Sequence, residues 1–209
     1  MEGFAVEGTA PYPWPWDGRL DPSRLALVAV GCQRWLADRT SGVEGALAAL
    51  ARTASAVRDV GGLVVVVRHG RPTGAARRRS LLPRPGEVGW EPVTSCVRGD
   101  LVVHALGVDA FFGGSLDADL RSLDRDTLVL GGLGLETAVY STMTGANDRG
   151  YECLALIDAS APHDAHVAER ALHSITMSGG IFGAVGMSTV LCAALEGASR
   201  KSQARKEPA

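Results

Sequence analysis

The 209-residue sequence lacks the features that mark secreted, membrane and metal-binding proteins. Its four cysteines include no CxxC pair, which favours reduced, mostly buried thiols over a disulfide framework or a zinc site. No apolar run reaches the roughly 18 residues that a membrane span needs. The first residues have neither the basic start nor the apolar core of a signal peptide. We therefore expect a cytoplasmic protein.

An excess of one charge is also missing. The 21 lysines and arginines nearly balance the 23 aspartates and glutamates, and the formal net charge is -2. This balance favours neither nucleic acid nor an anionic membrane as a partner. We expect a small-molecule ligand or another protein instead. The length allows one α/β domain with a full core, but not two such domains and a linker.

The sequence does contain a series of short, continuous apolar runs. Such runs without alternation are typical of strands buried on both faces of a parallel sheet, and they span residues 25–30, 63–67, 127–130 and 153–157. Residues 101–104 predict another short strand. Apolar residues spaced three and four apart predict a helix over 43–57, and we also expect helices over 116–123 and 137–149. Strands alternating with helices predict a three-layer α/β/α domain with a doubly wound, mainly parallel sheet of about six strands.

Segments of different composition flank or interrupt this domain, which we place at residues 25–198. Residues 1–24 are rich in Pro, Gly and Trp and predict an extended arm packed on the domain or on a neighbouring subunit. Residues 70–99, with three consecutive arginines at 77–79, predict a long excursion at the strand ends. The charged segment 199–209 is predicted to be disordered. Apolar surface on the arm and on GGIFGAV predicts a homo-oligomer.

Three segments resemble blocks of the isochorismatase-like (cysteine hydrolase) superfamily. They are LALVAVGCQRWL at 25–36, GDLVVHALGVDAFFGGSLDADL at 99–120 and GGLGLETAVYSTMTGANDRGYECLALIDAS at 131–160. Within that superfamily, PYPWPWDG at 11–18, TMTGANDRGYECL and MSGGIFGAV at 177–185 are most similar to the biuret and ureidoacrylate amidohydrolase branch. The resemblance covers nearly the whole chain and implies the isochorismatase-like hydrolase fold. We expect no cofactor.

The resemblance also implies a catalytic triad, and all three of its positions are replaced. The family's basic Asp falls on Gly31, its charge-stabilising Lys on Ala105 and its nucleophilic Cys on Ala138. Because a thiolate nucleophile needs a neighbouring base and a positive charge, we expect no hydrolysis through a thioester. In the family, a cis peptide precedes the position of Gly134, and the amides there and at the Cys position form an oxyanion hole. GLGLETA retains the turn, so we expect a polarising pocket to persist.

Three further residues are candidates for replacement chemistry. Cys32 follows the lost Asp and is either a relocated nucleophile or, as we favour, a buried inert thiol. His104 and Asp109 lie near the lost Lys and would form a general acid/base pair if they converged. Alternation along the strand, however, points His104 away from the face of Ala105.

Six residues are predicted to line the surviving pocket: Gln33, His69, Phe111, Gly134, Glu136 and Tyr140. A structural hydrogen-bonding role is an open alternative for Gln33, and helix capping is one for Glu136. A further set resembles a metal cluster in its spacing: His163, Asp164, His166 and His173. Because most of these crowd the start of a solvent-facing helix, we expect no metal site.

Three functions remain open. The first is a non-hydrolytic enzyme that catalyses an elimination, isomerisation or cyclisation on a carbonyl-containing metabolite, as in natural-product biosynthesis. The second is a catalytically inactive homologue that binds a ligand or completes a hetero-oligomer with an active paralogue. The third is an atypical amidohydrolase that uses Cys32 or a bound water. Fold alone does not choose among them.

Overall fold

Six parallel strands form a single sheet in the computed structural model, which describes residues 3–71, 82–93 and 97–204. The strand order is β3-β2-β1-β4-β5-β6. The strands are β1 (Leu25–Val30), β2 (Leu63–His69), β3 (Leu101–Ala105), β4 (Thr127–Leu133), β5 (Glu152–Ala161) and β6 (Ala184–Gly186). The predicted three-layer α/β domain is confirmed. The arginines at 77–79 and Cys96 lie outside the described residues.

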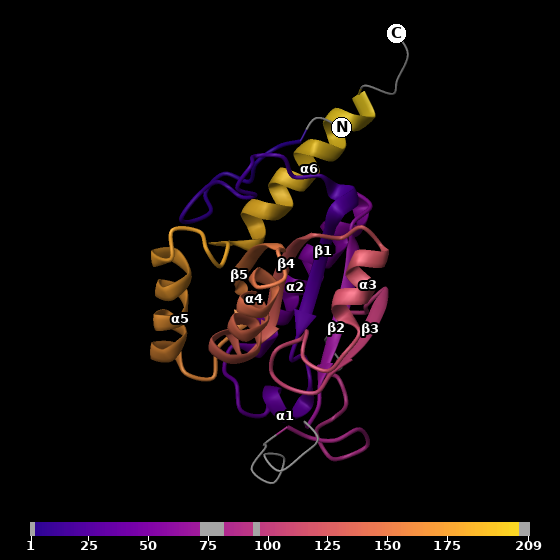
Figure 1. The fold of residues 1–209 in the computed structure, drawn as a ribbon, viewed down its shortest axis with the longest axis vertical. Coiled ribbons are helices and arrows are strands. Elements are labelled where there is room, and N and C mark those ends of the chain that lie inside the picture. The colour runs from indigo at the N-terminus through magenta and orange to yellow at the C-terminus, as the bar shows by residue number, and fades with distance from the viewer. Residues whose placement is uncertain (1–2, 72–81, 94–96, 205–209) are drawn as a thin grey trace.

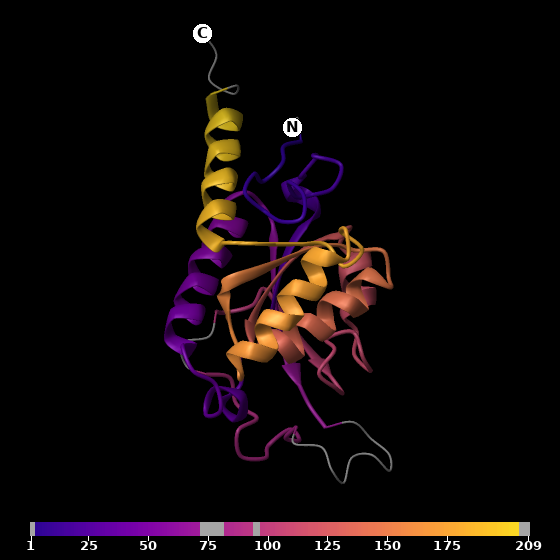
Figure 2. The ribbon, with the colours of Figure 1, turned by 90° about the vertical axis from the view of Figure 1, so that its left-hand side faces the viewer.

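Helices cover both faces of the sheet (Figures 1 and 2). One face carries α1 (Arg34–Ala37), α2 (Val43–Asp59) and α6 (Ser188–Ala204). The opposite face carries α3 (Leu116–Ser122), α4 (Tyr140–Asn147) and α5 (Ala165–Met177). Two short helical turns complete the chain: η1 (Pro22–Arg24) before β1 and the π-helical turn η3 (Leu135–Val139) between β4 and α4.

The apolar patterns explain both layers. Every residue of β1 is buried, because side chains on its two faces enter different apolar clusters. On α2 the predicted face, including Leu47, Leu50 and Val57, packs against the sheet. Burial on both faces therefore accounts for the continuous apolar runs.

The strands extend further at their carboxyl ends than the apolar runs predict. β2 continues to His69, which pairs in register with Ala105 of β3. β4 continues through two glycines to Leu133, which pairs with Ala161 of β5. Pairing with a neighbouring strand holds these residues extended although their composition breaks the apolar pattern.

Both terminal segments are structured: the N-terminal arm pairs with the sheet, and a helix extends into the C-terminal segment. In the arm, Val6 and Trp14 form an antiparallel bridge, Trp14 is buried, and Ala10 pairs with Val185 of β6. At the other end, α6 continues to Ala204, so the prediction of disorder from residue 199 is wrong for 199–204. The residues of this segment include good helix formers, and an ion pair joins Arg200 to Glu196 one turn earlier, at 3.8 Å. Within the described ranges, no helix is long and apolar enough to span a membrane.

Candidate functional site

The direction of strand order reverses between β1 and β4, so the carboxyl ends of these two strands flank the topological switch point of the sheet. In open α/β sheets this crevice is the usual place for a ligand. Gly31 directly follows β1 and Gly134 directly follows β4. The predicted triad positions and the turn therefore lie at the edge where a site is expected.

Gly31 adopts a backbone conformation that suits glycine, with φ at +67°. A β-carbon added there would lie 2.6 Å from the carbonyl oxygen of Leu133 and 2.9 Å from Cδ1 of Leu36. Both distances are below ordinary contact, and one partner is backbone. The position that the resemblance assigns to an aspartate therefore has no room for a side chain unless the backbone shifts.

Ala105 and Ala138, the other two triad positions, are 1 % and 2 % exposed. Both belong to the apolar cluster under α3 and α4, together with Phe111 and Met143. Neither they nor Gly31 carries a titratable side chain. Phe111 packs on Tyr151 with ring centroids 5.4 Å apart, and it lies beneath the guanidinium of Arg149.

The turn after β4 is retained, but its hydrogen bonds limit what it can bind. Gly134 is left-handed at φ +77°, and its carbonyl accepts bonds from the amides of Thr137 and Val139, both at 3.1 Å. The amide of Gly134 donates to Ala161 O at 2.8 Å. Among the described residues, cis peptides precede only Pro11 and Pro15, so the peptide before Gly134 is trans. The expected oxyanion donor at Gly134 is therefore already engaged.

Glu136, in the first turn of η3, bridges to the loop before α5. Its Oε1 accepts hydrogen bonds from the backbone amides of His163 and Asp164, both at 2.9 Å. Its Oε2 is buried without a hydrogen-bond partner in the described structure. Oε1 thus acts as a cap, although at the approach to α5 rather than within its own helix.

His163 also lies at this edge, although the sequence grouped it with a metal-like set and not with the pocket. It lies two residues after the end of β5, and its Nδ1 lies 2.7 Å from Oγ1 of Thr40, 123 residues away. The Thr40 hydroxyl donates to Leu36 O at 2.7 Å, and Arg39 O also lies 3.4 Å from Nδ1. In the tautomer in which the Thr40 hydroxyl proton points to Leu36 O, Nδ1 carries the imidazole proton.

The other ring nitrogen of His163 faces the Gly134 turn. Nε2 lies 3.1 Å from the point where a β-carbon on Gly134 would stand, and Thr137 Oγ1 and Ala138 N lie 2.4 Å and 3.6 Å from the same point. No hydrogen-bond partner of Nε2 lies within the described ranges. An imidazole held by its Nδ1 proton with the Nε2 lone pair available has the arrangement of a general base.

Gln33 has the structural role that remained open in the sequence. Its Oε1 accepts from the His69 amide at 2.7 Å. Its Nε2 donates to His69 O at 3.2 Å and to Trp90 O at 3.1 Å. Because Gln33 is only 1 % exposed, these bonds clamp the ends of β1 and β2 to the loop around Trp90.

His69 is equally buried and belongs to the same part of the edge. Its Nδ1 lies 2.7 Å from Gly107 O, whereas Nε2 is buried without a partner among the described residues. Burial lowers the pKa of His69 to about 4, and its hydrogen bond to Gly107 only partly offsets that effect. His69 is therefore a neutral imidazole.

His104 and Asp109 do not converge. His104 is exposed on the side of β3 opposite to Ala105, as alternation predicts, and its ring stacks on Trp90 at 5.4 Å. Asp109 accepts from the Phe111 amide at 2.9 Å, and its carboxylate packs against Gly145 of α4. Burial raises the pKa of Asp109. The structure thus separates the two members of the candidate acid/base pair.

Cys32 and Tyr140 lie close to the edge but away from its polar groups. Cys32 is 2 % exposed, its thiol donates to Val30 O at 3.6 Å, and it packs in the α2 and α6 cluster, whereas Ala138 lies in the opposite one. Tyr140 is half-buried and meets Phe182 edge-on. In the described part of the chain, no group of three His, Cys, Asp or Glu side chains is arranged to hold a metal ion.

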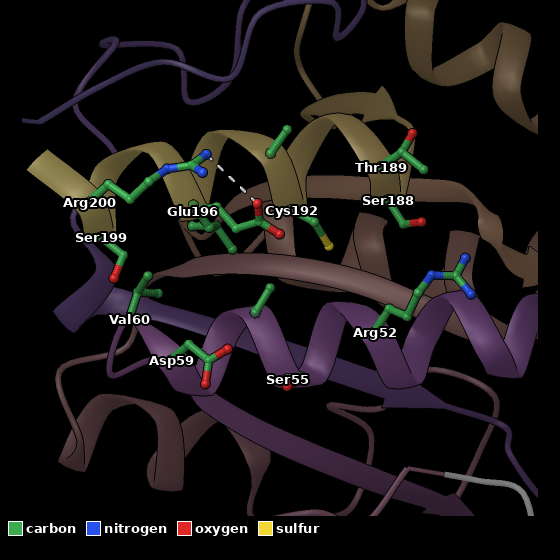
Figure 3. Close-up of a pocket in the computed structure, with 13 residues that line it drawn as sticks. Arg52, Ser55, Asp59, Val60, Ser188, Thr189, Cys192, Glu196, Ser199 and Arg200 are labelled. Carbon is green, nitrogen blue, oxygen red and sulfur yellow. Dashed lines mark ion pairs between the residues drawn. The ribbon is translucent and has the colours of Figure 1, made fainter.

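Two cavities lie away from this edge. One is a groove of about 610 Å³ between α2 and α6, where Arg52 and Asp59 face Cys192 and Glu196 (Figure 3). The other, of about 570 Å³, lies beside the arm and includes Trp16, Asp126 and Glu152. Neither is lined by a residue predicted to bind the ligand. The survival of a pocket at the triad positions stays a prediction.

Comparisons with known proteins agree with the fold. The family model described as the isochorismatase domain matches residues 25–186. A cysteine hydrolase from Pseudomonas syringae pv. phaseolicola is 21 % identical with a TM-score of 0.77, covering 95 % of this chain and all of that one. N-carbamoylsarcosine amidase from Thermoplasma acidophilum is 23 % identical, with a TM-score of 0.63 and 79 % and 96 % coverage.

A third similar structure is an isochorismatase family protein from Burkholderia thailandensis. It is 25 % identical to this chain, with a TM-score of 0.69, and the match covers 85 % of this chain and 97 % of that one. These structures match the sheet and its helices over most of the chain.

Proposed function

The chain belongs to the isochorismatase family, and from that premise we propose that it is a non-hydrolytic enzyme acting by proton transfer on a carbonyl-containing metabolite. The observation that carries this proposal is the imidazole of His163, which Thr40 holds with Nε2 beside the Gly134 turn. Elimination, isomerisation and cyclisation next to a carbonyl can each begin with removal of an α-proton. A positioned imidazole is the commonest group for that step.

Thiol hydrolysis is poorly supported at the same edge. Gly31, Ala105 and Ala138 supply no base, cation or nucleophile. Restoring an aspartate at Gly31 would place its β-carbon against the Leu133 carbonyl and the Leu36 side chain. At Gly31, neighbours therefore occupy the space that an aspartate side chain would need.

The proposed step balances with the groups present. The Nε2 lone pair of His163 takes the α-proton, and the C–H electrons form the C=C bond of an enolate. The carbonyl oxygen gains the negative charge, and the hydroxyl of Thr137, whose bond to Gly134 O is long at 3.3 Å, is positioned to turn toward it. The imidazolium then returns the proton to the same or another atom.

Exchange of α-protons in D₂O tests this step without knowledge of the natural substrate. Hydroxyacetone, pyruvate and acetophenone serve as probes, and ¹H NMR follows the loss of their α-proton signals. We expect exchange above the buffer rate, lowered on the order of 100-fold by His163→Gln. His166→Gln, an exposed histidine at the start of α5, is the matched control and should retain the rate. Equal rates in the two variants, or no exchange by the wild-type protein, would count against the proposal.

A second candidate is the inactive homologue that binds a ligand or completes a hetero-oligomer with an active paralogue. The burial of Ala105 and Ala138 in an apolar cluster favours it, since a decayed site is expected to fill with apolar contacts. It predicts no exchange with any probe, together with a change in the hydrolysis rate of an intact family member on mixing. The Cys32 form of the third candidate loses support, because Cys32 is buried in the cluster on the other face from Ala138. The form that uses a bound water remains a prediction.

Self-association is part of the proposal. Trp16, Met177 and Ile181 are 69 %, 70 % and 64 % exposed, and Trp16 lies close to Gly180 in the loop before β6. Apolar side chains gathered at such a place favour a contact with a second copy. Light scattering at micromolar concentration should give a homo-oligomer, and a monomer would refute this. The cytoplasmic location remains a prediction.

A further inference from the structure

His69 combines full burial with an unused hydrogen-bonding atom. Its side chain is 1 % exposed, and Nε2 has no partner among the described residues. Buried polar atoms are almost always paired, because leaving one unpaired costs stability. At the carboxyl edge of an open α/β sheet, where ligands bind, an atom that no described residue satisfies is suited to a hydrogen bond from a bound ligand.

The tautomer of His69 decides which kind of partner fits. Nδ1 lies 2.7 Å from Gly107 O, and a carbonyl oxygen can only accept, so Nδ1 carries the proton. Nε2 then presents a lone pair. Since burial keeps the ring neutral at physiological pH, Nε2 is an acceptor and not a cationic donor.

Within the ranges 3–71, 82–93 and 97–204, no neighbouring group donates to this lone pair. Ala105 is in register with His69 on the adjacent strand and has only a methyl group to offer. The Gln33 amide, which contacts the same residue, already donates to the carbonyls of His69 and Trp90. The acceptor is thus held rigidly, by strand pairing on one side and by the Gln33 clamp on the other.

We propose that His69 Nε2 accepts a hydrogen bond from a ligand that carries an O–H or N–H donor, next to Ala105 at the carboxyl ends of β2 and β3. This deepens the proposed function, on which it rests, by stating the ligand class: a carbonyl-containing compound with a hydroxyl or amine group. The methyl ether of the same compound is excluded, because its oxygen only accepts. A site with a buried acceptor separates a ligand that has a donor from an analogue that lacks one more strongly than an apolar pocket does, because the analogue leaves the acceptor unpaired.

Matched pairs of small probes test the ligand class directly. Each pair is a hydroxyl compound and its methyl ether: phenol and anisole, 4-hydroxyacetophenone and 4-methoxyacetophenone, and hydroxyacetone and methoxyacetone. Binding is followed on protein labelled with ¹⁵N histidine, since the shift of a non-protonated Nε2 responds to an accepted hydrogen bond. We expect at least one hydroxyl compound to shift the His69 signal and to bind on the order of 10-fold more tightly than its ether.

Two variants separate the two ring nitrogens. His69→Asn keeps a donor where Nδ1 meets Gly107 O but removes the acceptor, so it should fold and lose the preference for hydroxyl compounds. His69→Gln places its amide oxygen near the position of Nε2, so it should retain that preference. If His69 acts only through its bond to Gly107 O, the opposite result is expected. His69→Asn would then keep the wild-type preference for hydroxyl compounds, and His69→Gln would lose it.

The outcomes separate this inference from the proposed function. The protein could show a preference for hydroxyl compounds that depends on His69 and yet exchange no α-protons. That result would support the hydrogen bond to His69 Nε2 and refute the proposed proton-transfer activity. Ethers that bind as well as hydroxyl compounds would overturn the inference. So would a His69 signal that no probe shifts, because Nε2 would then hold only a buried water.

Discussion

Replacing Gly31 by alanine tests whether the structure has room for a side chain at the position that the resemblance assigns to an aspartate. The new β-carbon would lie 2.6 Å from the Leu133 carbonyl oxygen and 2.9 Å from Leu36 Cδ1, on a backbone at φ +67°. The left-handed conformation costs a non-glycine residue about 1–2 kcal/mol. Overpacking of a buried site adds about 1–3 kcal/mol. We therefore expect Gly31→Ala to lower the free energy of unfolding by about 2–5 kcal/mol.

Gly61 provides the matched control. Its φ is +85°, and a β-carbon there meets nothing within 4 Å. Gly61→Ala should thus cost only the conformational part, about 1–2 kcal/mol. Urea denaturation of both variants measures the difference, provided that the slope of the free energy against urea concentration is unchanged. Equal losses in the two variants would refute the claim that Leu133 and Leu36 occupy the space that a side chain at Gly31 would need.

Two further predictions concern the clamp at the ends of β1 and β2. Folding lowers the pKa of His69 from 6.5 to about 4, so between these pH values the unfolded chain binds the proton and the folded chain does not. The free energy of unfolding should therefore fall by up to about 3 kcal/mol as the pH is lowered from about 6.5 to about 4. Urea midpoints at pH 7 and pH 5 check this, and a His69→Asn variant with the same drop would contradict it. Gln33→Leu removes partners from the His69 amide and two carbonyls and should cost at least about 2 kcal/mol in the same assay; a smaller loss would show that the clamp is dispensable.

The fold could be predicted from the sequence because its main signal is local. Continuous apolar runs such as 25–30 reflect burial on both faces, which parallel pairing under two helical layers requires. The strand ends were harder to place. His69 and Leu133 are held extended by pairing with Ala105 and Ala161, an interaction between segments that single runs do not encode.

The sequence indicated the edge of the sheet at which the candidate residues lie, but only some of their contacts. Strand ends indicated the edge, and alternation correctly turned His104 away from Ala105. The sequence did not predict that Asp109 accepts a hydrogen bond within its own turn and lies beside Gly145. The direction of a side chain in a turn does not follow from its spacing in the sequence. His163 lies two residues after the end of β5, so the same strand-end rule was a usable signal for it.

The partner of His163 could not have been found in the same way. Thr40 lies in the loop before α2, 123 residues earlier, and only folding brings the two together. Spacing alone grouped His163 with the histidines at 166 and 173, which resembles a metal pattern. In the structure its Nδ1 instead contacts a hydroxyl and a carbonyl oxygen. Long-range contacts between loops decided the chemistry here.

The central claim is that this chain retains the family fold without the family's thiol hydrolysis. Ammonia release from biuret, ureidoacrylate, nicotinamide and N-carbamoyl compounds tests it, with the wild-type protein, Cys32→Ser and Cys192→Ser assayed side by side. Because Gly31, Ala105 and Ala138 supply no base, cation or nucleophile, we expect all three proteins to match the buffer rate. Turnover by the wild-type protein and Cys192→Ser that Cys32→Ser abolishes would contradict the account.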